Sequence, residues 1–318
     1  MRQYISDEQI ASVMTTRDFV ESCDEAFRLY GLGKMVSPLR KEEVSREGEM
    51  DLFRLVMPGW WKGRFPGQKV IEERSDVKMG RLGSRTAVIE LEDMRRGDRI
   101  SFDAERITNM RTGAAGALGA KYLAKMPVRT AAILGTGRIA QALGRCIDVA
   151  LAPETIRVTS RTAERRAAYQ ADVGGDLSCD LDMVADIEAC IDGADAVFTS
   201  VPTPEPILFD VESHVHISVI GGDGRSTQLD PGLLTRRFVV PDHGEQVLKS
   251  GEFLALCERE ETPRWVKGEE DEILNIGHAS LGHLEHLRGQ GCIAYSSGLA
   301  IQDVHAAAIV WGKIREIK

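Results

Sequence analysis

The sequence lacks the features that place a chain in a membrane or outside the cell. None of its apolar runs is long enough to span a bilayer, and the opening residues, MRQYISDEQIASVM, lack the apolar core of a secretory signal peptide. Its six cysteines are scattered without a CxxC pair, which argues against a zinc site or a disulfide framework. We therefore expect a cytoplasmic protein with reduced thiols and no metal ion.

An excess of basic residues is also missing. The chain has 40 Lys and Arg against 49 Asp and Glu, a formal net charge of -9. Because surfaces that bind nucleic acid are basic, this balance argues against nucleic acid as a partner. With 318 residues, 43% of them hydrophobic, the chain is long enough for two domains with cores of their own.

The most informative segment is AAILGTGRIA at residues 131–140. An apolar run ends at Leu134, and a helical pattern begins a few residues later. In a dinucleotide-binding turn the first glycine permits the turn, the second lets the backbone approach the pyrophosphate, and a small third residue keeps helix and strand close. Helix N–H groups then hold the phosphates. The segment predicts a nicotinamide dinucleotide site that includes Gly135, Thr136, Gly137, Arg138 and Ile139.

Strand-like and helix-like segments alternate after Pro127. The expected strands are 130–134, 155–159, 196–200, 216–221 and 238–241, and the expected helices are 163–172, 181–192, 280–288 and the stretch from Leu299 to the end. Alternation at this spacing predicts an α/β fold with a doubly wound parallel sheet of the Rossmann type.

The first 124 residues show a different pattern. A helical stretch at 6–30, with Ser6 and Thr16 as candidate N-caps, precedes short strands. The expected strands are 52–57, 69–73, 85–91 and 99–103, with a hairpin turn at 94–99. Residues 107–124 look helical but contain three glycines, so this backbone should press against a neighbour, and the cofactor is one candidate. The amphipathic last helix should pack back onto this part.

The end of the second Rossmann strand decides between the two nicotinamide cofactors. A carboxylate there binds the ribose 2′-OH of NAD, whereas Arg or Ser accommodates the 2′-phosphate of NADP. The chain has Ser160, Arg161 and Thr162 at this place, and no acidic residue before Glu164. Arg161 could pair with the phosphate through two charge-assisted hydrogen bonds, or it could be a solvated surface residue. We expect NADP(H), with NAD(H) as the alternative.

Several segments, in this order, make the chain resemble the ornithine cyclodeaminase/μ-crystallin family. They are PLR at 38–40, LVMPG at 55–59, PGQKVI at 66–71, MRTGAAGALGAKYLA at 110–124, ILGTGRIA at 133–140, GGDG at 221–224, LDP at 229–231 and SSGLAIQDV at 296–304. Residues 72–85 and 257–292 fit the family poorly, and we interpret the second as a surface elaboration. The resemblance implies a homodimer whose α+β substrate-binding and dimerisation domain, residues 1–124 and 296–318, surrounds a Rossmann domain at 125–295.

The resemblance also implies a set of cations that bind an amino-acid carboxylate, namely Arg40, Lys69 and Arg111. Several fixed cations suit a carboxylate, and arginine adds bidentate geometry. Arg111 lies among small apolar residues, where an unpaired charge would be costly. Arg40 could instead belong to a solvated charge run over residues 40–43.

The same resemblance implies residues that act on or around the reacting atoms. Asp223 of GGDG follows an apolar strand and would contact the substrate nitrogen and exchange a proton, with Lys69 as the second catalytic residue. The alternative for Asp223 is an ordinary Asp-Gly turn. Residues expected around the nicotinamide and ribose are Thr86, Thr112, Ser200, Val201 and Ser297.

One departure from the family pattern bears on the reaction. Members that cyclise ornithine resemble one another in having a glutamate two residues before a Met-Pro pair, where this chain has Leu55. Leucine cannot transfer a proton, so the chain is more similar to ketimine reductases and amino-acid dehydrogenases. We expect hydride transfer to or from the carbon beside a carboxylate. Two alternatives stay open, a cyclodeaminase-type ammonia lyase with tightly bound NAD and a non-catalytic NADPH-binding protein.

Overall fold

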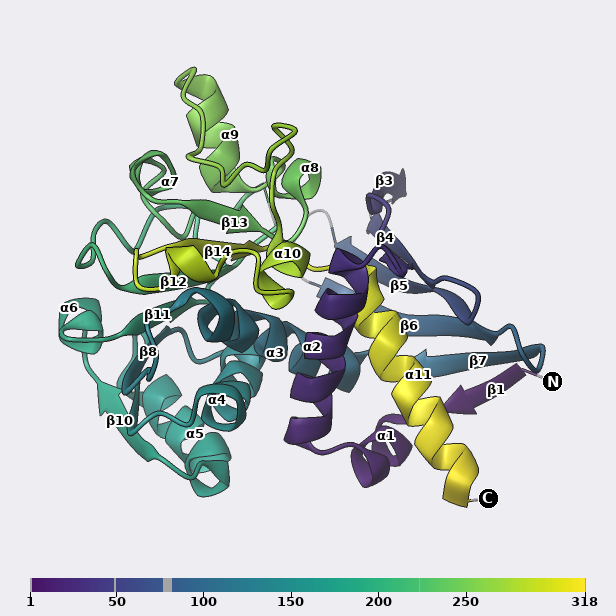
Figure 1. The fold of residues 1–318 in the computed structure, drawn as a ribbon. Coiled ribbons are helices and arrows are strands. Elements are labelled where there is room, and N and C mark those ends of the chain that lie inside the picture. The colour runs from purple at the N-terminus through teal and green to yellow at the C-terminus, as the bar shows by residue number, and fades with distance from the viewer. Residues whose placement is uncertain (1, 49, 77–81, 223, 318) are drawn as a thin grey trace. The chain divides into compact units, whose positions relative to one another are not determined.

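The computed structural model describes residues 2–48, 50–76, 82–222 and 224–317. The chain divides into two units, which Figure 1 draws as ribbons. Unit 1 comprises Met1–Arg111 and Leu299–Lys318, and unit 2 comprises Thr112–Gly298. Unit 1 is thus assembled from both ends of the chain. Its first segment ends at Arg111, earlier than the expected boundary after residue 124.

Unit 1 is built on a mostly antiparallel sheet with the strand order β1-β7-β6-β5-β4-β2, in which β3 also pairs with β4. The strands are β1 (Arg2–Ile5), β2 (Met35–Val36), β3 (Lys41–Glu47), β4 (Met50–Trp61), β5 (Phe65–Asp76), β6 (Leu82–Asp93) and β7 (Asp98–Asp103). The expected strands lie within longer ones, and the turn after β6 is confirmed. All residues of β3 are exposed, so no apolar alternation indicated this edge strand.

Helices α1 (Asp7–Val13), α2 (Thr16–Gly31) and α11 (Ala300–Ile317) belong to unit 1. Helix α11 packs against α2 and against β4, β5 and β6, and Figure 1 shows α11 in yellow beside α2 in purple. Ser6 caps α1, as expected. The expected cap Thr16 is wrong, because Thr15 is the residue whose hydroxyl accepts the Asp18 N–H at 3.2 Å.

Unit 2 has a parallel sheet with the strand order β10-β9-β8-β11-β12-β14-β13, which confirms the doubly wound Rossmann arrangement. The strands are β8 (Thr130–Leu134), β9 (Thr155–Thr159), β10 (Asp180–Val184), β11 (Ala196–Thr199), β12 (His216–Ile220), β13 (Val239–Pro241) and β14 (Ile293–Ser296). The predicted helix at 181–192 is wrong in its first part, which is strand β10, and right only over Ile187–Ile191. Asp180 and Asp182 alternate with Leu181 and Met183, a two-residue period that suits the edge strand β10.

Further helices complete unit 2. They are α4 (Arg138–Leu151), α5 (Ala163–Val173), α6 (Ile187–Ile191), α7 (Gly232–Arg236), α8 (Gly244–Val247), α9 (Gly251–Glu258), α10 (Ile276–Ser280) and the 3-10 turns Gly174–Asp176 and Glu285–Leu287. The predicted helix at 280–288 is also wrong. Helix α10 ends at Ser280, and Gly282 adopts φ +83°, a left-handed conformation that interrupts a helix.

The glycine-rich helix α3 (Glu105–Leu123) packs closely against neighbouring elements of the protein. A Cβ added at Gly113 would lie 2.6 Å from the carbonyl carbon of Ala142 in α4, and one at Gly119 would lie 2.8 Å from the Ala294 Cβ in β14. These close approaches explain why glycines, which weaken a helix, occur here. They also explain why α3 beyond Arg111 belongs to unit 2.

Candidate active site

The turn between β8 and α4 has the geometry expected for a dinucleotide site. Gly135 adopts φ +120°, and a Cβ there would lie 2.8 Å from the Val201 Cγ1, so only glycine fits. Helix α4 begins at Arg138 after the N-cap Gly137, and no side chain caps this end within the described residues. Its first N–H groups and its dipole are therefore suited to a pyrophosphate.

The segment after β9 presents an exposed cation where the ribose of a dinucleotide would lie. Thr162 caps α5, since its hydroxyl accepts the Arg165 N–H at 3.3 Å, and the Ser160 carbonyl accepts a hydrogen bond from Arg166 at 2.6 Å. Arg161 is exposed, and no hydrogen bond or ion pair of its side chain is found in the described part of the chain. Its guanidinium is thus able to bind an anion.

Ser200, Val201 and Ser297 all follow the carboxyl ends of parallel strands in unit 2. The buried Ser297 hydroxyl donates to Asp242 Oδ1 at 2.7 Å, and Asp242 Oδ2 accepts the Gly298 N–H at 2.7 Å. Burial raises the pKa of Asp242 above its ordinary value, although these hydrogen bonds oppose the shift. Asp242 was not expected from the sequence, but its place immediately after the apolar run VVP is the signal that could have indicated it.

Two of the expected carboxylate-binding residues meet in a buried charge cluster of unit 1. Lys69 on β5 is 1% exposed, and its Nζ lies 3.0 Å from Oδ1 and 2.9 Å from Oδ2 of Asp303 on α11, which is fully buried. The Arg111 Nε donates to the same Oδ1 at 3.1 Å. These three side chains sum to one positive charge, so the cluster can accept an anion.

Burial changes the proton affinity of Lys69. Desolvation, assisted by the charge of Arg111, lowers the pKa of Lys69 from 10.5 to about 8, and the Asp303 carboxylate opposes the shift. Lys69 is therefore still a cation at neutral pH, but it exchanges its proton more readily than an exposed lysine.

Asp303 and its neighbour Gln302 are functional candidates that the sequence alone did not reveal. The Gln302 Oε1 accepts from Arg111 Nη1 at 3.3 Å and from the Leu299 N–H at 3.1 Å, while its Nε2 lies 3.2 Å from the Cys23 Sγ. Gln302 thus orients the Arg111 guanidinium. The detectable signal was an adjacent polar pair inside the apolar helix LAIQDVHAAAIVW.

The register of the sheet shows what surrounds Lys69. Met57 pairs with Lys69, and Leu55 pairs with Ile71, so all four side chains lie on the same face. Leu55 is therefore an apolar neighbour of the charge cluster. Arg40 immediately precedes β3, its side chain is 11% exposed, and its Nε donates to Glu42 at 2.8 Å, so it is not a freely solvated residue.

The other expected site residues are Thr86, Thr112 and Asp223. Thr86 pairs with Glu72 and lines a pocket of about 400 Å³ with Gln68 and Val70, on the sheet face opposite to Lys69. The structure therefore does not bring Thr86 to the charge cluster. Thr112 follows Arg111 on α3 and is buried. Asp223 lies outside the described residues.

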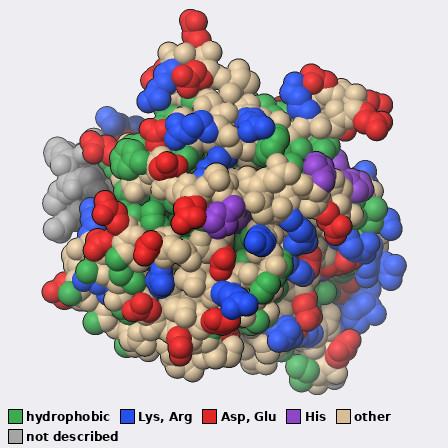
Figure 2. Space-filling view, turned by 60° about the vertical axis from the view of Figure 1, so that its left-hand side comes forward, with side chains coloured by type: hydrophobic (Ala, Val, Ile, Leu, Met, Phe, Trp, Pro, Cys, Tyr) green, Lys and Arg blue, Asp and Glu red, His purple; other side chains and the backbone are tan. Residues whose placement is uncertain are grey.

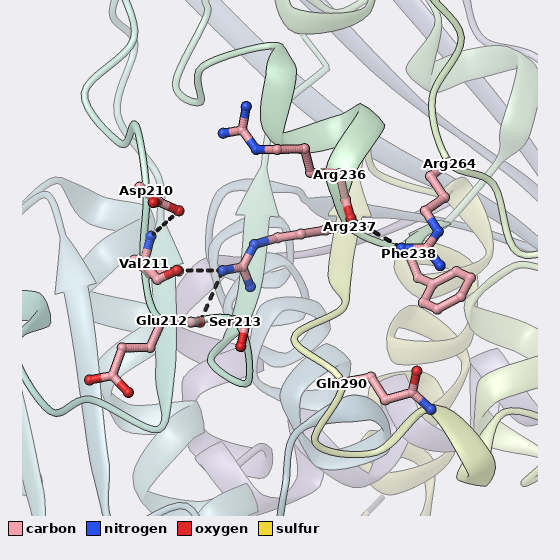
Figure 3. Close-up of a pocket in the computed structure, with 9 residues that line it drawn as sticks. All are labelled: Asp210, Val211, Glu212, Ser213, Arg236, Arg237, Phe238, Arg264 and Gln290. Atoms are coloured by element: carbon pink, nitrogen blue, oxygen red, sulfur yellow. Dashed lines mark hydrogen bonds between the residues drawn. The ribbon is translucent and has the colours of Figure 1, made fainter.

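A larger cavity, of about 800 Å³, lies at the other edge of the unit 2 sheet from the dinucleotide turn. It is formed by the segments that precede β12, β13 and β14 (Figure 3). Its best-defined element is Arg237, whose guanidinium donates to the carbonyls of Val211, Glu212, Val215 and Gly291. The Arg264 guanidinium lies 3.8 Å above the Phe238 ring. These contacts join loops at the amino edge of the sheet, opposite to the ligand edge of a Rossmann fold.

Two other kinds of feature to consider in the described residues are a metal site and a membrane span. These residues include no group of three or more His, Cys, Asp and Glu side chains placed to hold a metal ion, and no helix apolar and long enough to traverse a bilayer. Figure 2 shows acidic and basic side chains interspersed over the face in view.

Comparisons with known proteins identify relatives of this chain in sequence. The profile of the ornithine cyclodeaminase/mu-crystallin family matches residues 3–318. An alanine dehydrogenase of Archaeoglobus fulgidus is 28% identical over 317 residues, with 96% of this chain and 93% of that protein covered. The ketimine reductase mu-crystallin of Rattus norvegicus is 26% identical over 66% of this chain and 63% of its own length.

Solved structures show the same fold. The Delta(1)-pyrroline-2-carboxylate reductase of Thermococcus litoralis, in complex with NADH and L-proline, has a TM-score of 0.83 and 21% identity, with 99% of this chain and 98% of that chain covered. An archaeal alanine dehydrogenase dimer with bound NAD has a TM-score of 0.82 and 23% identity, covering 99% and 97%. The chain belongs to the ornithine cyclodeaminase/mu-crystallin family.

Proposed function

We propose that the chain is an NAD(P)H-dependent oxidoreductase that acts on the C–N bond of a small amino or imino acid. The observation that carries the proposal is the buried cluster of Lys69, Arg111 and Asp303, whose surplus positive charge suits a carboxylate. Relatives with related chemistry in their names support it, namely alanine dehydrogenase, ketimine reductase and Delta(1)-pyrroline-2-carboxylate reductase. Leu55 favours this chemistry over cyclisation, because it offers no proton-transferring group beside Lys69.

In this proposal Lys69 and Arg111, with Arg40, bind the substrate carboxylate through charge-assisted hydrogen bonds. A bound nicotinamide supplies or accepts the hydride at the adjacent carbon. Asp223 stabilises the protonated nitrogen of the iminium, which makes the carbon a better hydride acceptor, and it exchanges the nitrogen's proton. The lowered pKa of Lys69 lets this residue also take part in proton exchange near neutral pH.

The test is net turnover of the cofactor. Wild-type protein with NADPH or NADH and a panel of cyclic ketimines, or of 2-oxo acids with ammonium or methylamine, should give a steady decrease in absorbance at 340 nm. A cyclodeaminase would release ammonia from a diamino acid without net change at 340 nm. A binding-only protein would bind the dinucleotide and turn over nothing on the panel. Either result would contradict the proposal.

We further infer that NADP(H) is the preferred cofactor, because the exposed Arg161 can pair with a 2′-phosphate and residues 159–163, at the end of β9, include no Asp or Glu. Arg161→Ala should weaken NADPH binding by about 10- to 100-fold, the value of a charge-assisted hydrogen bond, and change NADH binding by less than about 2-fold. Titration calorimetry with both cofactors measures this, with the exposed Arg165→Ala as control. Wild-type protein that binds NADH as tightly as NADPH would refute the inference.

We also propose that the protein is a cytoplasmic homodimer. All six cysteines are free, as a reducing compartment maintains them. A structural neighbour, the archaeal alanine dehydrogenase, is described as a dimer. The face of the unit 1 sheet that carries Thr86 includes the 59% exposed Tyr4 and the partly exposed Val70 and Val88, which a second copy could cover.

A further inference from the structure

The carboxyl edge of the unit 2 sheet contains a buried amide that the proposed mechanism does not use. Gln228 lies in the segment between β12 and α7 and is 2% exposed. We propose that Gln228 is a positioning residue that holds the loop after β11 against the dinucleotide turn and thereby sets the affinity for the cofactor. The inference rests on the proposed function, because it concerns the same dinucleotide site.

The hydrogen bonds of the Gln228 side chain join two neighbouring strand ends. Its Oε1 accepts from the Thr199 Oγ1 at 2.6 Å and from the Val201 N–H at 2.9 Å, and its Nε2 donates to the Ile220 carbonyl at 2.7 Å. Thr199 and Ile220 are the last residues of β11 and β12. Ligands of Rossmann folds bind beyond these ends, so one amide fixes the spacing of two ligand-facing loops.

A second buried group holds Gln228 itself in place. Glu252 on α9 is fully buried, and its Oε1 accepts the backbone N–H groups of Gln228 at 2.5 Å and Leu229 at 3.3 Å. Its Oε2 accepts the hydroxyl of Tyr295 on β14 at 2.6 Å. A buried carboxylate is costly unless it is hydrogen-bonded, and three donors meet that requirement here. Gln228 is therefore anchored through its backbone while its side chain anchors the loops.

The loop after β11 contacts the dinucleotide turn through Val201. A Cβ at Gly135 would lie 2.8 Å from the Val201 Cγ1 and 3.2 Å from the Ser200 carbonyl oxygen, so this loop packs directly on the glycine of the dinucleotide turn. The Val201 N–H is the group that Gln228 holds. Without this bond, the loop that packs on Gly135 is no longer held in a fixed position, and the dinucleotide turn loses its support on this side. The expected consequence is weaker dinucleotide binding, beyond any loss of stability.

A matched control separates positioning from stability alone. Ser218 lies within β12, is 1% exposed, and its hydroxyl donates to the Gly116 carbonyl at 2.9 Å and contacts His216 Nε2 at 2.9 Å. It is as buried as Gln228 and its hydroxyl makes two hydrogen bonds against three for the Gln228 amide, but neither bond reaches the loops beyond the strand ends. Ser218→Ala should lower the melting temperature while changing dinucleotide affinity by less than about 2-fold.

The experiment measures NADH and NADPH dissociation constants by fluorescence, well below each variant's melting temperature. Gln228→Leu should weaken binding of both cofactors by about 10-fold or more, since three hydrogen bonds are lost, and Thr199→Val by a few-fold. Gln228→Glu gives a pH signature. Its ionised carboxylate repels the Ile220 carbonyl, whereas the protonated acid donates to it, so cofactor affinity relative to wild type should recover as the pH is lowered from 8 to 6.

The outcomes distinguish this inference from the function on which it rests. Wild-type protein that binds neither dinucleotide would overturn the proposed function, and the inference with it. Wild-type binding that Gln228→Leu and Gln228→Glu leave unchanged would overturn the inference alone. The same holds if Ser218→Ala weakens cofactor binding as much as the Gln228 variants do. If Gln228→Leu does not fold, Thr199→Val and the pH dependence of Gln228→Glu decide.

Discussion

Lys69→Met is expected to lower kcat/KM for the imino-acid substrate by about 30- to 4,000-fold, the cost of truncating one member of a buried, hydrogen-bonded charge pair. The substitution removes the ammonium that lies 2.9 and 3.0 Å from the Asp303 carboxylate and eliminates the surplus positive charge of the cluster. Asp303 keeps Arg111 as a partner, so the variant retains a neutral pair and should fold. Steady-state kinetics at 340 nm measures the loss.

Two controls make this result specific. Lys62→Met changes an exposed lysine of the same unit and should leave kcat/KM within about 2-fold, as surface substitutions do. The dissociation constant for the dinucleotide should also be unchanged in Lys69→Met, since the dinucleotide turn belongs to unit 2. Wild-type-like kinetics of Lys69→Met would show that this cluster does not bind the substrate.

The pKa of Lys69 adds a pH dependence of defined sign. In the folded protein it is lowered from 10.5 to about 8, so between these pH values the unfolded chain binds more protons than the folded one. Stability therefore rises with pH across this window, while below pH 8 the cost of the buried charge is present in full. The unfolding free energy of wild type should increase relative to that of Lys69→Met from pH 8 to 10. Substrate affinity should fall over the same range, because the cation is lost.

The parts of the fold that the sequence predicted well are those whose local pattern agrees with their burial. Strands β8 and β9 have the bounds expected, since the apolar run of β8 and the alternate residues Ile156 and Val158 of β9 are buried in a parallel sheet. Strand β3 has no buried residue, and its pairing with β4 depends on the tertiary register rather than on apolar alternation. Strand β14 is four residues long and lies between the segment that we interpreted as an elaboration, residues 257–292, and the family segment at 296–304, so no expected strand covered it.

The residues of the candidate site also divide into those that a local sequence pattern predicts and those that depend on tertiary packing. The glycine turn could be predicted because strand, turn and helix are contiguous in sequence. Lys69 and Arg111 were expected from the family resemblance, but their common partner was not, because Asp303 is 234 positions from Lys69. A carboxylate in an apolar helix indicates a buried charge, but only the packing of α11 on β5 shows which cations it meets.

Asp303→Asn is the substitution expected to destabilise the protein most. Asp303 is fully buried and is the carboxylate that pairs with both Lys69 and Arg111. An amide of the same shape leaves two buried cations without a counter-charge, and breaking a buried pair in this way costs about 3–5 kcal/mol. Urea denaturation followed by circular dichroism measures the loss. Glu316→Gln, an exposed carboxylate on the same helix, should change the unfolding free energy by less than about 0.5 kcal/mol.

The double variant Lys69→Met/Asp303→Asn identifies the cause of that loss. If uncompensated charge is responsible, removing one of the two cations should relieve part of the penalty, so the double variant should be more stable than Asp303→Asn alone. If Asp303 matters only for the packing of α11, the two effects should instead add. Activity should not return in either case, because the double variant still lacks the ammonium that the substrate carboxylate requires. Recovery of stability without recovery of activity would therefore separate the two roles of the cluster, since Asp303 balances the charges that Lys69 and Arg111 present to the substrate.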